Sequence, residues 1–210
     1  MDQLAQLAEK YPDLTVCLPD IQRAMEVLLA CYRNGGKVLI CGNGGSAADS
    51  EHVAGELMKG YLLKRPLPEA ARRKLLQAFP KNGRYLADHL QGALSALSLV
   101  SQTALITAYA NDVAPDMIFA QQVYGYGQAG DVLIAISTSG DSTTVVHAAQ
   151  VARALGLHTI GFTGQGGGKL AGVCEVTIRV PYEGATAVQE RQLPIYHALC
   201  ARLEAEFFAE

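Results

Sequence analysis

The sequence predicts an α/β fold in which helices cover both faces of a parallel sheet. Short apolar runs alternate along the chain with longer segments whose apolar residues recur every three or four positions. Two of these runs, 37–41 and 131–136, lead directly into loops rich in Gly and Ser. Because parallel sheets bind ligands outside the carboxyl ends of their strands, we expect both loops at a binding edge.

Length and composition indicate one globular domain. The 210 residues can bury one sizeable core, and 50% of them are apolar while 18% are charged. The formal net charge of -3 provides no electrostatic footprint for nucleic acid. The N-terminus does not resemble a secretory signal, and no apolar run reaches the ~18 residues of a membrane span. Five scattered cysteines without CxxC spacing indicate reduced thiols. We therefore expect a cytoplasmic protein that binds neither nucleic acid nor a membrane.

The first half of the chain is expected to begin with a helical segment over residues 1–34. Prolines break its first part, Asp20 can cap its second part, and Gly35 with Gly36 can end it. The elements that follow are a strand over 37–41, a helix over 46–59, an apolar segment over 93–99, and helices over 101–110 and 119–127.

The second half repeats the alternation of strand and helix. Gly156 can end the first of its helices, and a glycine-rich turn over 164–168 leads into a short helix. The expected elements are strands over 131–136, 157–162 and 175–180, a helix over 142–154, and a final helix over 186–208.

The two loops have the composition of a phosphate site. A helix N-terminus presents unpaired backbone N–H groups, glycine lets the backbone approach an anion closely, and hydroxyls add donors. The loop over 137–142 carries four hydroxyls and a single charged residue, Asp141. The loop over 42–46 could by itself be a tight connection, since it has neither the Walker pattern nor GxGxxG spacing. Together the loops favour a small phosphorylated ligand.

Two pairs of polar residues at helical spacing are candidates for chemistry. His52 and Glu56 lie four apart, and Gln189 and His197 lie eight apart, so each pair shares one side of its expected helix. The alternatives are a solvated pair for the first and a hydrogen-bonded core histidine for the second. The four side chains could hold zinc, or they could act as acid and base without a metal. Asn111 and Asp112, after the helix over 101–110, would by default form a turn.

Taken together, these motifs resemble the phosphoheptose isomerases of the sugar isomerase (SIS) domain superfamily. The similarity extends in order over most of residues 20–207. It is carried by the motifs Gly42-Asn43-Gly44-Gly45-Ser46, His52-x-x-x-Glu56, Asn111-Asp112, Ile136-Ser137-Thr138-Ser139-Gly140-x-Ser142, Leu170-Ala171-Gly172, Ile178-Arg179-Val180-Pro181, and Val188-Gln189-Glu190 with His197.

The resemblance implies a single SIS domain with a flavodoxin-like three-layer sandwich, and an enzyme that isomerises sedoheptulose 7-phosphate to D-glycero-D-manno-heptose 7-phosphate. This aldose–ketose isomerisation is the first step toward nucleotide-activated heptoses. The family is homotetrameric, with sites between subunits. The implied roles are phosphate binding for Ser137, Thr138, Ser139 and Ser142; sugar binding for Asn43, Gly44, Gly45, Ser46, Asn111, Asp112 and Gln189; one zinc ion per subunit on His52, Glu56, Gln189 and His197; and acid/base catalysis by Glu56 and His197.

Residues 68–91 have no counterpart in the standard family pattern and are expected to be a helical insertion. The segment is locally basic, with five Lys and Arg residues against Glu69 and Asp88. It follows the helix that carries Glu56, so it is either a solvated surface helix or a lid or subunit-contact arm near the site.

Two other functions compete with this interpretation. The first is a non-catalytic SIS protein similar to the DnaA-initiator-associating protein, a tetrameric binding module whose pattern lacks the equivalents of Glu56 and His197. The second is an isomerase for a different ketose phosphate, with the insertion changing selectivity. The presence of both Glu56 and His197 favours catalysis.

Overall fold

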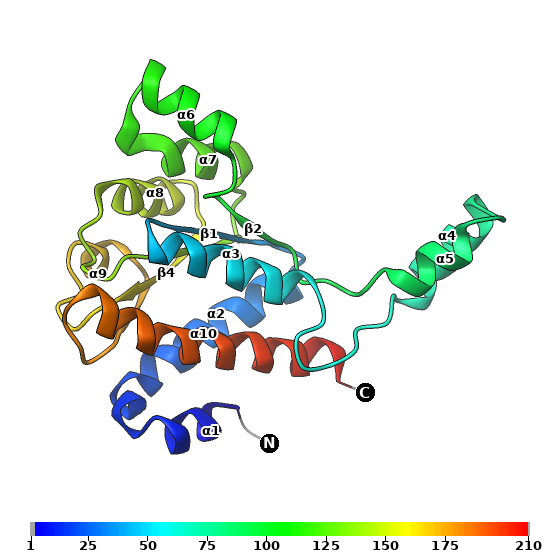
Figure 1. Ribbon diagram of the computed structural model, residues 1–210, viewed down its shortest axis with the longest axis horizontal. Coiled ribbons are helices and arrows are strands. Elements are labelled where there is room, and N and C mark those ends of the chain that lie inside the picture. The colour runs from blue at the N-terminus through cyan, green and yellow to red at the C-terminus, as the bar shows by residue number, and fades with distance from the viewer. Residues whose placement is uncertain (1–2, 210) are drawn as a thin grey trace.

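The computed structural model describes residues 3–209 and confirms the α/β class (Figure 1). Over these residues the sheet has five strands in the order β2-β1-β3-β4-β5, and every neighbouring pair is parallel. The strands are β1 (Val38–Gly42), β2 (Ala96–Ser98), β3 (Val132–Ile136), β4 (His158–Thr163) and β5 (Val176–Arg179).

The strand order places a topological switch point between β1 and β3. β1 pairs with β2 on one side and with β3 on the other, so that Val38 lies opposite both Ala96 and Val132. This order is that of flavodoxin-like sheets, in which ligands bind where the direction of winding reverses. Both Gly- and Ser-rich loops leave the sheet here, since β1 ends at Gly42 and β3 ends at Ile136.

Helices cover the sheet on both sides, as three-layer packing requires. The helices are α1 (Gln3–Lys10), η1 (Pro12–Cys17), α2 (Leu18–Arg33), α3 (Gly45–Met58), α4 (Glu69–Ala78), α5 (Gly83–His89), α6 (Thr103–Asp112), η2 (Pro115–Met117), α7 (Ile118–Tyr126), α8 (Thr143–Ala154), α9 (Leu170–Val173) and α10 (Ala185–Phe208).

Successive residues of each central strand point to opposite faces of the sheet and pack into two separate hydrophobic cores. Val38 and Ile40 point into a core shared with α2, α3 and α10, whereas Leu39 and Cys41 point into a core shared with α7 and α8. β1 and β3 are buried at every residue, which explains why their sequences are continuous apolar runs and not alternating ones.

One local prediction was wrong, and the structure adds detail to two others. Only Ala96–Ser98 of the apolar segment 93–99 forms a strand, because the Leu94 N–H donates to the Leu57 carbonyl at 3.0 Å and not to the sheet. Asn111 and Asp112 are the last residues of α6 and not a turn. The predicted final helix over 186–208 is confirmed, because α10 runs through Pro194 and continues past it for several turns.

All five cysteines are buried and free. None of the helices in the described part of the chain is long and apolar enough to cross a membrane.

The segment 68–91 forms a helical hairpin that projects away from the body (Figure 1). α4 and α5 pack on each other, and α4 buries none of its own residues. The exposed apolar side chains include Phe79, 55% exposed, and Tyr85, 65% exposed. The chain leaves and returns at one point, because Pro66 pairs with Gln91 and the Gly92 N–H donates to the Arg65 carbonyl at 2.9 Å.

We predict that replacing residues 69–90 with a short Gly/Ser linker leaves a folded domain. The hairpin supports neither core, and the ends of the cut are already adjacent. Far-UV circular dichroism should lose only the helical signal of the hairpin, and thermal unfolding should stay cooperative. A variant without a cooperative transition would show that the body depends on the hairpin.

Candidate functional site

The two predicted loops meet at the switch point of the sheet. Asn43, in the loop after β1, donates its amide N–H groups to Ser142 Oγ and Thr144 Oγ1, both at 2.8 Å. Ser142 and Thr144 belong to the loop and first turn that follow β3. One side chain therefore ties the two loops into a single surface.

The loop after β3 forms a cradle of hydroxyl groups. Ser137 Oγ and Ser139 Oγ lie 3.5 Å apart, and the backbone N–H of Asp141 donates to Ser139 Oγ at 3.1 Å. Gly140 has a φ of +73°, and a Cβ there would collide with the Gly167 carbonyl, so only glycine fits. The Asp141 carboxylate accepts the Lys169 backbone N–H at 3.1 Å. Hydroxyls at a helix N-terminus suit a phosphate.

The loop after β1 brings α3 against α10. Gly44 has a φ of +58°, which lets the chain turn from the strand into the helix. A Cβ on Gly45 would collide with the side-chain amide of Gln189, so this glycine allows α10 to approach the start of α3. Ser46 is buried, and its carbonyl accepts the Ser50 hydroxyl at 2.7 Å.

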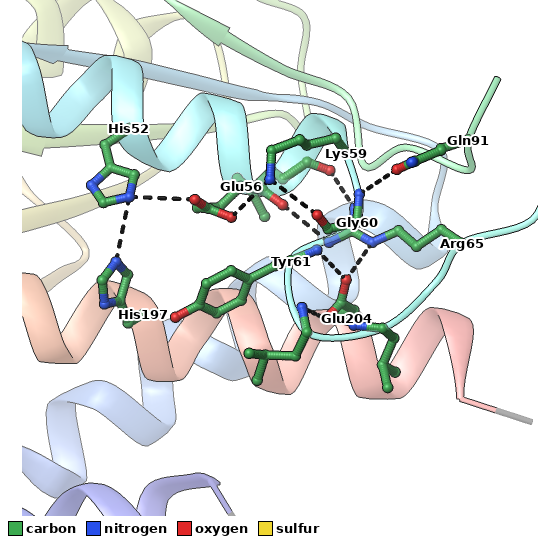
Figure 2. Close-up of polar contacts among 12 residues, drawn as sticks. His52, Glu56, Lys59, Gly60, Tyr61, Arg65, Gln91, His197 and Glu204 are labelled. Atoms are coloured by element: carbon green, nitrogen blue, oxygen red, sulfur yellow. Dashed lines mark hydrogen bonds and ion pairs between the residues drawn. The ribbon is translucent and has the colours of Figure 1, made fainter. Parts of the chain in front are cut away.

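A cluster of His52, Glu56 and His197 lies further along the same two helices (Figure 2). His52 Nε2 is 3.3 Å from Glu56 Oε1 and 3.5 Å from His197 Nε2. The predicted sharing of a face by His52 and Glu56 is therefore confirmed, and His197 faces both from α10. Lys59 Nζ lies 3.6 Å from Glu56 Oε2.

Two further residues fix the orientation of His52. The Tyr196 hydroxyl donates to Asp49 Oδ1 at 3.1 Å and lies 3.2 Å from His52 Nδ1. Since an ionised carboxylate only accepts, the hydroxyl proton goes to Asp49 and His52 Nδ1–H donates to the hydroxyl oxygen. This contact leaves Nε2 of His52 directed toward Glu56 and His197.

Burial shifts the acid–base balance of the cluster. Burial and the neighbouring His52 lower the pKa of His197, although Glu56 opposes the shift. Burial raises the pKa of Asp49, partly offset by the hydrogen bond from Tyr196. A His197 with a lowered pKa is a neutral imidazole near pH 7, which can accept a proton.

The spacing of the donor atoms in this cluster is that of zinc ligands in part. Zinc holds nitrogen and oxygen ligands at about 2.0–2.1 Å, which separates tetrahedral ligands by roughly 3.3 Å. The spacings of 3.3 and 3.5 Å around His52 Nε2 match that edge length. Glu56 Oε2 is buried without a hydrogen-bond partner, and Nδ1 of His52 is held by Tyr196 as in many metal sites.

The match to a metal site is not complete. Within residues 3–209, no group of three or more His, Cys, Asp or Glu side chains is arranged to hold a metal ion as it stands. The residues fit zinc by chemistry and by pairwise spacing, and metal binding would require them to close around a common point.

Asn111 and Asp112 do not join this site within one chain. Both are exposed at the end of α6, and Asn111 Nδ2 donates to Asp112 Oδ1 at 2.8 Å. α6 buries none of its residues and lies far from α10 in Figure 1. The remaining predicted residues lie in the two loops and on α3 and α10.

Sequence reasoning missed Tyr61, Asp49 and Tyr196. The ring of Tyr61 lies 5.6 Å from that of His197, and both residues line a cavity of about 230 Å³ between α1 and α10. Asp49 could have been found, since it lies three residues before His52 on the same helix. Tyr61 follows α3 in a loop and carries no periodic signal.

Comparisons with known proteins agree with this architecture. The SIS domain family matches residues 16–74 and 86–164, an interruption that falls within the α4–α5 hairpin. A phosphoheptose isomerase from Rhodospirillum rubrum is 40% identical over 94% of this chain and 91% of its own length. The solved phosphoheptose isomerase from Neisseria gonorrhoeae is 32% identical with a TM-score of 0.75, covering 96% of this chain and 94% of its own. That from Francisella tularensis is 30% identical with a TM-score of 0.75, covering 91% and 88%.

Proposed function

The chain belongs to the phosphoheptose isomerases of the SIS domain family, and from this premise we propose that it converts sedoheptulose 7-phosphate to D-glycero-D-manno-heptose 7-phosphate. This is the first step toward nucleotide-activated heptoses. The observation that carries the proposal is the meeting of a carboxylate and an imidazole, Glu56 and His197, in a domain that also presents a hydroxyl cradle at the switch point of its sheet. A binding module would not require such a pair.

The spacing along α3 supports this substrate. Gly45 marks the cradle end, and at 1.5 Å per residue His52 lies about 10 Å further along the helix. An extended seven-carbon sugar with its phosphate in the cradle would therefore bring its other end, C1 and C2, to the cluster. Binding at the phosphate positions the carbons without taking part in bond making.

The reaction moves one proton between neighbouring carbons. A base removes a proton from C1 while an acid protonates the carbonyl oxygen on C2, which produces an enediol. The proton is then delivered to C2, and the hydroxyl on C1 loses its proton as the new carbonyl forms. We assign the carbon proton to the Glu56 carboxylate, which takes it from C1 and returns it to C2. We assign the oxygen proton to His197, whose lowered pKa favours the neutral imidazole that accepts the proton of the C1 hydroxyl and passes it to the oxygen on C2.

We also propose one zinc ion per subunit on His52, Glu56, Gln189 and His197. The spacings around His52 Nε2 support His52, Glu56 and His197 as ligands, and Glu56 Oε2 accepts no hydrogen bond. Gln189 lies against Gly45 and is included because the family resemblance implies it. When bound, the ion would polarise the substrate carbonyl.

A homotetramer with sites between subunits is the proposed assembly. Its support is that α6, which carries Asn111 and Asp112, buries none of its residues within one chain. An unburied helix of this composition needs a partner, and a second subunit could bring these two residues to the cluster. The cytoplasmic location also stays a prediction.

We predict that Glu56→Gln and His197→Asn each lower kcat on sedoheptulose 7-phosphate by ~10²-fold or more, the usual scale for a general acid or base. Exposed Glu51→Gln on the same helix and His158→Asn at the surface are matched controls. Coupled assays of purified, folded variants measure the effect. Wild-type turnover in both site variants would remove these residues from the mechanism.

We predict that Ser137→Ala combined with Ser139→Ala mainly raises KM. The lost hydroxyls contact the phosphate equally in the ground and transition states, so kcat should change little. Unphosphorylated sedoheptulose serves as the control. It has no phosphate for the two hydroxyls to contact, so its KM should already be high in the wild type and should change little in the double variant. An unchanged KM for the phosphorylated sugar would place the phosphate elsewhere.

We predict near one zinc per chain in protein purified without chelator. Elemental analysis measures the content, and His52→Ala should lower it because one nitrogen ligand is lost. Chelation should reduce both the metal content and the turnover, and added zinc should restore them. Full turnover from a metal-free sample would contradict a catalytic role for the ion.

A further inference from the structure

A buried ion pair stands beside the cluster without belonging to it (Figure 2). Arg65 Nε lies 2.7 Å from Glu204 Oε1, and both side chains are 0% exposed. Taking two charges out of water is costly unless the geometry is good and the remaining hydrogen-bonding groups are satisfied. The role of the pair therefore follows from the other groups that Arg65 and Glu204 bind.

Glu204 holds the loop that follows α3. Its two oxygens accept the backbone N–H groups of three consecutive residues, Tyr61, Leu62 and Leu63, at 2.7, 2.6 and 2.9 Å. Burial alone would raise the pKa of Glu204, but these bonds and that from Arg65 outweigh it and lower the pKa. The carboxylate therefore stays ionised, and four N–H groups converge on it.

Arg65 holds the end of α3 itself. Its Nη1 donates to the Leu57 carbonyl at 2.7 Å and its Nη2 to the Glu56 carbonyl at 3.0 Å. The last carbonyls of a helix have no partner within the helix, so Arg65 acts as a cap at the turn that carries Glu56. The ring of Phe208 covers the guanidinium at 4.7 Å.

The loop in turn orients Tyr61. Its backbone is fixed on Glu204, and its ring reaches toward His197 on α10 (Figure 2). Burial and the nearby Glu56 raise the pKa of Tyr61, which keeps its hydroxyl protonated. Glu204 lies about two helical turns after His197 on α10. The ion pair thus joins the helix of Glu56, the loop of Tyr61 and the helix of His197.

We infer that Glu204 is a positioning residue, which through Arg65 and the loop sets Glu56 and Tyr61 relative to His197. This inference rests on the proposed function of that site. A positioning residue differs from a purely structural ion pair because its loss lowers the rate of a protein that still folds. Displacing a reacting group by about 1 Å can lower the rate by ~10²-fold.

The test compares Glu204→Gln with Glu206→Gln. The amide keeps the shape of Glu204 but replaces one acceptor oxygen with a donor, so the four N–H groups can no longer all be accepted. Glu206 lies on the same helix and pairs at the surface with Arg33 and Arg202. Arg65→Lys is the second site variant, because it retains the charge but cannot cap both carbonyls of α3.

Kinetics on sedoheptulose 7-phosphate and crystal structures provide the two readouts. For folded Glu204→Gln and Arg65→Lys we expect kcat to fall on the order of 10²-fold with little change in KM. We expect the Tyr61 ring to move away from its 5.6 Å separation from His197 in Glu204→Gln. Glu206→Gln should match the wild type in both.

The outcomes separate this inference from the proposed function. A folded Glu204→Gln variant with wild-type kcat overturns the inference, and if that variant does not fold, Arg65→Lys decides by the same criterion. If the wild type does not convert sedoheptulose 7-phosphate, the proposed function is wrong. The positioning role of Glu204 is then judged from the crystal structures of the variants alone. Unmoved Glu56 and Tyr61 would then overturn the positioning role.

Discussion

The site depends on the packing of α3 along α10. Both helices start at the carboxyl edge of the sheet and run side by side, with Gln189 against Gly45 at one end and His197 facing His52 further on. Val53 and Leu57 of α3 share a core with Ile195 and Leu199 of α10, so apolar packing sets the separation of the helices. Polar side chains at the edge of this helix–helix contact, such as His52 and His197, then lie opposite each other. The acid–base cluster is thus a consequence of how two amphipathic helices bury their apolar faces.

Local features of the site could be predicted from the sequence, whereas long-range features could not. The spacing of His52 and Glu56 is set by the helical period, and the Gly- and Ser-rich loops follow recognisable strands. By contrast, Arg65 and Glu204 lie 139 positions apart, and no periodic pattern links them. The sequence showed β2 only as part of a longer apolar segment. The strand is limited to three residues because the Leu94 N–H donates to the Leu57 carbonyl of α3 and not to the sheet. Asn111 and Asp112 are exposed at the end of α6, away from the cluster, and no local pattern indicates this position.

Two kinds of charged feature therefore have different physical roles. The Arg65–Glu204 pair is buried and saturated with hydrogen bonds, so it fixes the backbone that carries Glu56. The projecting α4–α5 hairpin carries exposed charges and apolar groups, and it joins the body through a narrow connection near Arg65. The first feature holds the backbone beside the site, whereas the second contributes no residue to either core. This division explains how an insertion can follow so closely after the helix that carries Glu56.

The most direct test of the central claim is turnover of sedoheptulose 7-phosphate in D2O, followed by NMR of the product. A proton moved by Glu56 and His197 through an enediol would exchange with solvent, because His52 beside them is exposed. We therefore predict D-glycero-D-manno-heptose 7-phosphate that carries deuterium at C2. Absence of this product, or product formed without any deuterium at C2, would contradict proton transfer by a pair that is open to solvent.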